Sequence, residues 1–218
     1  MVPHLCFGCN ARLYRGEKTL CTLCRNQLPL TGYDFLEENS VDRIFYGRVK
    51  VAKAASMLFF HTHGITKNLI HYLKYRNQKL IGIFLGDWFG EQLKNQGQLK
   101  GIDMVIPVPL HPKKLRKRGY NQVALFAERL AFHLNAEYEE NLLLKTANTK
   151  TQTQKSRWYR WQGKQELYQL TDPEILKDKS VLLVDDVITT GGTLEACGKA
   201  LHKAPGLKLF IATMAVVP

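Results

Sequence analysis

The chain has 218 residues, 45% of them hydrophobic and 23% charged, a composition that excludes a disordered polypeptide and suffices for one α/β domain with a small appendage. No apolar run approaches the ~20 residues that a membrane-spanning helix needs, and residues 1–10 lack the charged and apolar regions of a secretory signal, so we expect a cytoplasmic protein without a membrane partner. The formal net charge is +12, and the excess of Lys and Arg is concentrated in blocks of sequence that contain no acidic residue. Such blocks suit binding of a pyrophosphorylated sugar or a nucleic acid. A solvated basic surface without a ligand is the alternative.

Four cysteines near the N-terminus are spaced CxxC-x11-CxxC, at Cys6, Cys9, Cys21 and Cys24. Two intervening residues let both thiols of a tight turn face one ion, and two such turns complete a tetrahedral site for structural Zn²⁺. A pair of disulfides is the alternative, which a reducing cytosol disfavours. We predict a zinc-binding knuckle over 1–30 that needs its metal to fold, a linker over 31–47 and a second domain over 48–218.

Strand and helix patterns alternate through the rest of the chain. We predict strands over 49–61, 103–108, 138–144, 181–184 and 208–217, and helices over 65–75, 82–96 and 121–134. The segment 49–61 equally fits a hairpin, and Asn121 is the expected N-cap of the last helix. Strands that alternate with helices indicate an α/β fold with a mostly parallel sheet.

A dense cluster of positive charge follows the strand predicted over 103–108. Five cations occupy six positions: Lys113, Lys114, Arg116, Lys117 and Arg118. We expect an anion-binding loop beside the sheet, in contact with pyrophosphate or with a DNA backbone. A solvated charge run is the alternative, although the Pro and Gly-Tyr-Asn-Gln residues around the cluster are untypical of a disordered tail.

Residues 150–164 interleave cations with aromatic side chains, among them Trp158 and Trp161. Aromatic rings stack on nucleobases while cations contact phosphates, so these residues are candidates for binding single-stranded DNA. It is an equally good explanation that the two tryptophans pack on the core or hold this segment in place as a flap.

The most informative stretch is 181–193, VLLVDDVITTGGT. Its four apolar residues predict a buried parallel strand, and Asp185 and Asp186 stand at the carboxyl end, where ligands of α/β sheets bind. The TTGGT turn leads into a helix whose N-terminus attracts anions, and Gly191 and Gly192 permit a close approach of the backbone. A phosphate therefore suits the turn, and the carboxylates suit the diol of an attached sugar. Helix-capping threonines are the alternative, but such caps do not require adjacent acids.

These thirteen residues resemble the phosphoribosyl pyrophosphate (PRPP) loop of type I phosphoribosyltransferases. Four features follow one another in the order typical of the ComF family of phosphoribosyltransferase-like proteins. They are the cysteine knuckle, the PVPLHP…RGYNQ block at 107–122, a TxxQ…R segment at Thr149, Gln152 and Arg160, and the PRPP loop. The resemblance covers nearly the whole chain. It implies a type I phosphoribosyltransferase-like, mostly parallel sheet flanked by helices, in a cytosolic bacterial protein of natural transformation that acts on incoming single-stranded DNA.

The resemblance also implies roles for individual residues. Asp185 and Asp186 are the implied catalytic pair, which orders the ribose diol together with a Mg²⁺ that bridges the diol and the pyrophosphate. The implied PRPP-binding residues are Val187, Ile188, Thr189, Thr190, Gly191, Gly192, Thr193, Lys74, Arg118, Gln152 and Arg160. In related transferases a segment such as 145–165 is a flap that closes over PRPP, but here Lys155 and Gly163 replace the usual leucine and asparagine. Lys74 has an alternative role as a cation at the C-terminus of its helix.

Three functions follow from these residues. The first is a DNA-handling factor of competence whose nucleotide site is regulatory. The second is an active phosphoribosyltransferase for a base or an amine. The third is an interaction module whose zinc knuckle docks a helicase-like partner.

Overall fold

The structure, a computed structural model, describes residues 4–96, 99, 101–146 and 167–218. Gln152, Trp158, Arg160 and Trp161 lie outside the described residues, as does most of the flap expected over 145–165, so their roles stay predictions.

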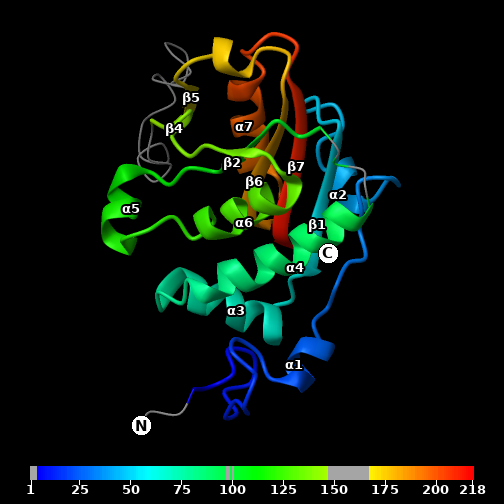
Figure 1. Ribbon diagram of the computed structural model, residues 1–218. Helices are drawn as coiled ribbons and strands as arrows, with labels where there is room; N and C mark the ends of the chain where they lie inside the picture. Colours follow the sequence, from blue (N-terminus) through cyan, green and yellow to red (C-terminus); the bar gives the residue numbers. More distant parts are fainter. Residues whose placement is uncertain (1–3, 97–98, 100, 147–166) are drawn as a thin grey trace.

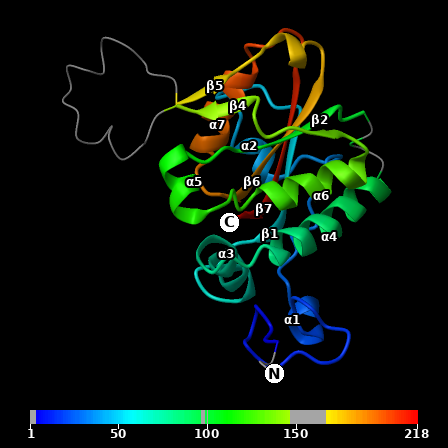
Figure 2. The ribbon, with the colours of Figure 1, turned by 60° about the vertical axis from the view of Figure 1, so that its left-hand side comes forward.

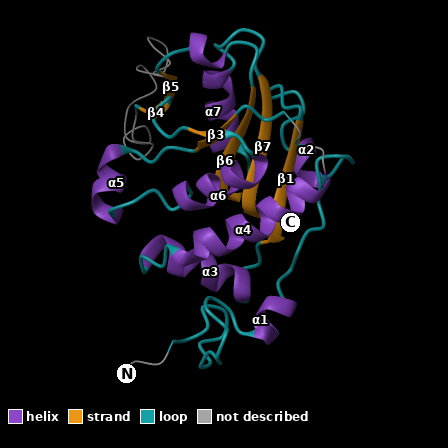
Figure 3. Ribbon diagram, viewed as in Figure 1, coloured by secondary structure: helices purple, strands orange, loops and turns teal. Residues whose placement is uncertain are grey.

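A five-stranded parallel sheet in the order β1-β7-β6-β2-β3 forms the centre of the molecule (Figure 1, Figure 3). Its strands are β1 Lys53–Phe59, β2 Met104–Pro107, β3 Glu137–Tyr138, β6 Ser180–Ile188 and β7 Lys208–Val216. The central strands β6 and β7 are apolar along most of their length because both faces of a parallel sheet are covered. The expected mostly parallel sheet is confirmed.

Helices cover both faces of this sheet. They are α1 Thr22–Asn26, α2 Ser40–Arg43, α3 Ile65–Tyr75, α4 Leu80–Gln96, α5 Pro112–Arg118, α6 Ala124–Leu134, the 3-10 turn η3 Glu174–Leu176 and α7 Gly192–Leu201. Alternate residues of β6 divide the core: Leu182 and Val184 share a cluster with α3, α4 and α6, whereas Val181 and Leu183 share one with α2 and α7. None of the helices among the described residues is long and apolar enough to cross a membrane.

The N-terminal segment with α1 lies beside α3 at one end of the molecule (Figure 2). At the other end is a small antiparallel pair, β4 Leu143–Lys145 with β5 Tyr168–Leu170. The single strand expected over 138–144 is therefore wrong. A turn at Asn141, whose N–H donates to the Glu139 carboxylate at 2.7 Å, ends β3 and redirects the chain into a separate sheet.

The basic segment after β2 is helix α5 and not the expected loop. The His111 ring accepts a hydrogen bond from the Lys113 N–H at 3.2 Å, Pro112 occupies the first turn, and Gly119 ends the helix with φ of 80°. Asn121 does not cap α6 as expected. Its side-chain oxygen accepts from the Val123 N–H at 3.2 Å and forms a turn one residue before the helix.

The segment 31–47, expected to be a linker, is held against the sheet. Val41 and Phe45 are buried in the cluster that contains α7. Asn39 and Asp42 form a reciprocal cap at the start of α2, and the Asp42 carboxylate also accepts from the Ala54 N–H of β1 at 2.7 Å. This segment therefore brings the neighbouring Arg48 close to the end of β6, which matters for the site described next.

Candidate functional site

Among the residues that the structure describes, the carboxyl end of β6 is paired on one side only. The strand β2 pairs with β6 as far as Val184, whereas β7 continues to Ile188. The β6 segment from Asp185 to Ile188 thus has a free edge on the β2 side. Because both carboxylates lie within the strand, Asp185 and Asp186 point to opposite faces of the sheet.

On the face covered by α3 and α6, Asp186 is buried and fully partnered. Its Oδ1 accepts from the Lys74 Nζ at 2.9 Å, and its Oδ2 accepts from the Gln122 Nε2 at 2.6 Å. The Gln122 Oε1 in turn accepts from the guanidinium of Arg118. The structure thereby brings together Lys74, Arg118 and Asp186, which the resemblance assigned to one PRPP site, and adds Gln122.

On the other face, Asp185 is half-buried near Lys145, Tyr168 and Cys197. Burial raises the pKa of Asp185 to about 8, and the charge of Asp186 adds to the rise, while the Asp186 N–H and Lys74 oppose it. Lys145 donates to the Tyr168 hydroxyl at 2.8 Å. Burial and the charge of Lys114 lower the pKa of Lys145.

The raised pKa of Asp185 predicts a pH-dependent stability. The Asp185 carboxyl loses its proton near pH 4 in the unfolded chain and near pH 8 in the folded chain. Its contribution to the stability of the folded state is therefore fully present below pH ~4 and decreases progressively up to pH ~8. Replacing it with neutral Asn removes this loss. The measurement is the melting temperature of Asp185→Asn minus that of the parent, in Mg²⁺-free buffer. We expect this difference to be several degrees larger at about pH 8.5 than at about pH 5. An unchanged difference between the two pH values, or the same rise in the exposed control Glu37→Gln, would contradict this account.

The TTGGT turn is held by an arginine that sequence reasoning missed. The Arg48 guanidinium donates to the Thr190 carbonyl at 2.6 Å and to the Glu195 carboxylate at 2.9 and 2.6 Å. The only sequence signal for Arg48 was its place in an acid-free basic block. The hydroxyls of the three threonines do not cap α7. The N-cap is Gly191, with φ of 73° and no side-chain cap from the described residues, and N–H groups left uncapped at a helix start are suited to an anion.

A cationic cavity of about 660 Å³ adjoins the Lys74–Asp186 ion pair, since Lys74 is one of its lining residues. It is lined by Lys74, Tyr75, Asn77, Lys113, Lys114, Lys117, Arg118 and Tyr120. Five of these residues are cations and none is an acid, because α5 presents its basic residues to the end of α3. Arg116 also lies on α5, where it is exposed, but it does not line this cavity.

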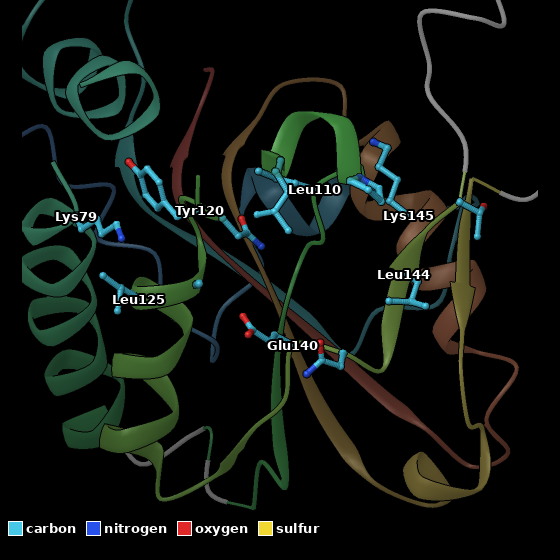
Figure 4. Close-up of a pocket in the computed structure, with 13 residues that line it drawn as sticks. Lys79, Leu110, Tyr120, Leu125, Glu140, Leu144 and Lys145 are labelled. Carbon is cyan, nitrogen blue, oxygen red and sulfur yellow. The ribbon is translucent and has the colours of Figure 1, made fainter. Parts of the chain in front are cut away.

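A second cavity of about 850 Å³ lies beneath α5, and sequence reasoning did not foresee it. In Figure 4, Leu144 and Lys145 of β4 face Tyr120 and Leu125 across it, with Glu140 at one end. Tyr120 also lines the cationic cavity. The second cavity therefore combines apolar walls with a few polar groups, as sites for small organic molecules do.

The four N-terminal cysteines form a cluster that can hold a metal ion such as zinc. They are free thiols, and their sulfur atoms lie within 4.8 Å of one another. Four sulfurs at ~2.3 Å from one Zn²⁺ form a tetrahedron with edges of about 3.8 Å, which is the distance between the Cys9 and Cys21 sulfurs. Burial opposes ionisation of Cys6, but N–H donors such as that of Cys21 lower its pKa to about 7.

The chain is similar to several known proteins. The family model described as "Phosphoribosyl transferase domain" matches residues 120–216, which include both carboxylates and the TTGGT turn. Competence protein F of Haemophilus influenzae is 29% identical over 207 residues, 91% of this chain and 90% of that protein. DNA utilization protein YhgH of Escherichia coli K12 is 26% identical over 222 residues, 92% of this chain and 91% of that protein. A glutamine PRPP amidotransferase from B. subtilis, complexed with ADP and GMP, is 19% identical with a TM-score of 0.47, over 67% of this chain and 30% of that chain.

Proposed function

Because the chain is a phosphoribosyltransferase-like protein of the ComF family, we propose that it binds PRPP with Mg²⁺ at the carboxyl end of β6. The observation that carries this proposal is the convergence of Lys74 and the Gln122–Arg118 pair on Asp186. Asp186 belongs to the part of β6 beyond its pairing with β2, which leads into α7, and Lys74 and Arg118 also line the cavity with five cations.

Each part of PRPP is assigned to residues of suitable chemistry. The N–H groups and hydroxyls of residues 189–193 take the 5′-phosphate, Asp185 and Asp186 take the ribose diol, and Lys74 and Arg118 take the pyrophosphate. Carboxylate and phosphate oxygens are the ligands that Mg²⁺ prefers, so Asp185 and the pyrophosphate suit the ion, which would neutralise the leaving group. Gln152 and Arg160 remain predicted contacts outside the described residues.

We further propose a cytosolic role in DNA uptake, with binding of single-stranded DNA. The similarity to competence protein F and DNA utilization protein YhgH supports this role. So does the surface around α5, where the ring of Tyr75, 68% exposed, lies beside Lys113 and Lys117. Lys114 and Arg116 extend the same surface, and an exposed ring among cations suits stacked bases and phosphates. Trp158 and Trp161 stay predicted contributors.

Calorimetric titration of the zinc-loaded protein with PRPP in excess Mg²⁺ tests the central proposal. We expect saturable binding, with ribose 5-phosphate binding at least tenfold more weakly, a difference of about 1.4 kcal/mol, because it lacks the pyrophosphate that Lys74 and Arg118 would contact. The absence of measurable heat with PRPP would overturn the assignment of the site.

Binding to an oligonucleotide should fall steeply as salt rises. Each contacted phosphate contributes about −0.7 to the slope of log affinity against log salt for a single strand. Lys113→Gln/Lys117→Gln should therefore flatten the slope by about 1.4. The control Lys67→Gln/Lys94→Gln removes the same charge from exposed positions on α3 and α4 and should keep the parent slope. Equal flattening in both variants, or no binding at about 50 mM salt, would refute the DNA proposal.

An active transferase is the second candidate, and the cavity beneath α5 favours it. An acceptor bound there would lie beside Lys145, close to Asp185. The acceptor nitrogen would attack C1 of the ribose, the C1–O bond to pyrophosphate would break, and the acceptor proton would pass to the Lys145 amine, whose neutral form burial favours. Pyrophosphate release with a panel of bases and amines is the measurement. Leu144→Trp should reduce release without weakening PRPP binding, whereas the exposed control Leu36→Trp should change neither.

A further inference from the structure

The zinc knuckle, residues 4–28, is docked on α3 by polar and aromatic contacts. The Asn68 Nδ2 donates to the Gly8 carbonyl at 2.7 Å, and the Tyr72 hydroxyl donates to the Asn10 Oδ1 at 2.7 Å. The rings of Phe7 and Tyr72 pack with their centroids 5.3 Å apart. All three knuckle residues belong to the first CxxC turn or directly follow it.

The shape of that turn depends on the cysteine cluster. The Cys6 sulfur accepts from the Gly8 N–H at 3.3 Å and from the Cys21 N–H at 3.2 Å, so the two CxxC turns meet at one sulfur. Cys6 and Cys24 are buried in the same hydrophobic cluster as Leu69 and Leu73 of α3. Because binding of the metal supplies the folding energy of such small sites, loss of the metal would remove the surface on which α3 rests.

The opposite side of α3 contributes directly to the candidate PRPP site. Lys74 pairs with Asp186 at 2.9 Å, and the Leu73 carbonyl accepts from the Tyr120 hydroxyl. Tyr72 and Lys74 are two residues apart on one helix, so they lie on different faces of it. The helix is therefore held between the knuckle and the end of β6, and a shift of Tyr72 moves Lys74 with it.

We propose that the metal-loaded knuckle positions Lys74 through α3, with Asn68 and Tyr72 as positioning residues. The inference rests on the proposed function, since Lys74 is assigned to the pyrophosphate of PRPP. By thermodynamic linkage, the affinities for Zn²⁺ and PRPP then depend on each other. The zinc knuckle is thus a working part of the sugar-phosphate site and more than an independent appendage.

The test compares two double variants of the full chain that both keep the four cysteines. Asn68→Ala/Tyr72→Phe removes both hydrogen bonds to the knuckle. The matched control, Asn26→Ala/Tyr14→Phe, makes the same changes at exposed residues of the knuckle. Zinc content, amide hydrogen exchange of α3 and the PRPP–Mg²⁺ affinity are measured for the parent and both variants.

We expect one zinc per chain in all three proteins. The Asn68/Tyr72 variant should show faster amide exchange over α3 and bind PRPP at least about fivefold more weakly, within the usual range of coupling between sites. The control should match the parent in both measurements. Removal of zinc from the parent should likewise speed amide exchange over α3 and weaken PRPP binding. In the Asn68/Tyr72 variant, removal of zinc should lower the PRPP affinity much less than it does in the parent.

Two outcomes would overturn the inference: unchanged exchange of α3 in the Asn68/Tyr72 variant, or parent-like PRPP affinity despite faster exchange. If the parent itself does not bind PRPP, the proposed function fails, and the exchange of α3 still tests whether the knuckle holds the helix. If zinc removal unfolds the whole chain, the comparison of the two zinc-loaded variants with the parent decides the question.

Discussion

Replacement of both carboxylates, in Asp185→Asn/Asp186→Asn, is expected to weaken binding of PRPP–Mg²⁺ by at least about a hundredfold. Each hydrogen bond to a charged group contributes about 1.5–3 kcal/mol, and two such losses together are worth roughly a hundredfold or more in affinity. In the parent, Lys74 and Gln122 each donate a hydrogen bond to one oxygen of the Asp186 carboxylate. In the asparagine variant one of these oxygens is replaced by an NH₂ group, which is itself a donor and cannot accept. Calorimetry with PRPP in excess Mg²⁺ is the measurement.

The control for this variant is Asp34→Asn/Glu37→Gln, which removes the same charge from positions far from the end of β6 along the chain. It should bind PRPP as the parent does. The asparagine variant must retain the parent's far-ultraviolet circular dichroism for the comparison to hold. An affinity within about threefold of the parent, a difference of less than ~0.7 kcal/mol, would show that the carboxylates are not the sugar ligands.

A side chain at Gly191 should both destabilise the fold and disturb the TTGGT turn. Gly191 has φ of 73°, and a Cβ there would lie 2.5 Å from the Ile44 Cγ2. The left-handed conformation costs a non-glycine residue about 1–2 kcal/mol, and overpacking adds about 1–3 kcal/mol. Gly191→Ala should therefore lower the free energy of unfolding by about 2–5 kcal/mol, measured by urea denaturation.

Gly47→Ala separates the two causes. Gly47 has φ of 69°, but a Cβ there would meet nothing within 4 Å. It should therefore show the conformational cost alone, about 1–2 kcal/mol. Similar losses in the two variants would mean that Ile44 moves aside freely and that the turn is not tightly packed against the segment after α2.

The sequence by itself determined the elements that depend on neighbouring residues. The helix predicted over 65–75 is α3, because Ile65, Leu69 and Leu73 repeat at helical spacing. The four cysteines cluster because two short turns bring each pair together. The strand, turn and helix order of 181–201 also followed from local pattern, since periodicity and glycine placement act over about ten residues.

Two predictions from local patterns were wrong, the first because of helix-capping residues and the second because of strand pairing. The cations of 113–118 suggested a loop, but His111, Pro112 and Gly119 start and end a helix there. The single strand expected over 138–144 divides, because β3 pairs with β2 whereas β4 pairs with β5 across the segment 146–167. The charges of 113–118 indicated exposure correctly, and the apolar residues of 138–144, apart from Leu144, indicated burial correctly. Neither pattern specified which secondary structure or which strand pairing the segment adopts.

Only the tertiary structure decided which residues form the site. Lys74 meets Asp186 across 112 positions, and Arg48 meets Glu195 across 147. These contacts depend on the strand order and on the early end of β2, which leaves one edge of β6 free. The continuation of β6 to Ile188 turns Asp185 and Asp186, as successive strand residues, to opposite faces of the sheet. A sequence pattern records the chemistry of each residue, whereas the neighbours of a residue distant in sequence follow from how whole strands and helices pack.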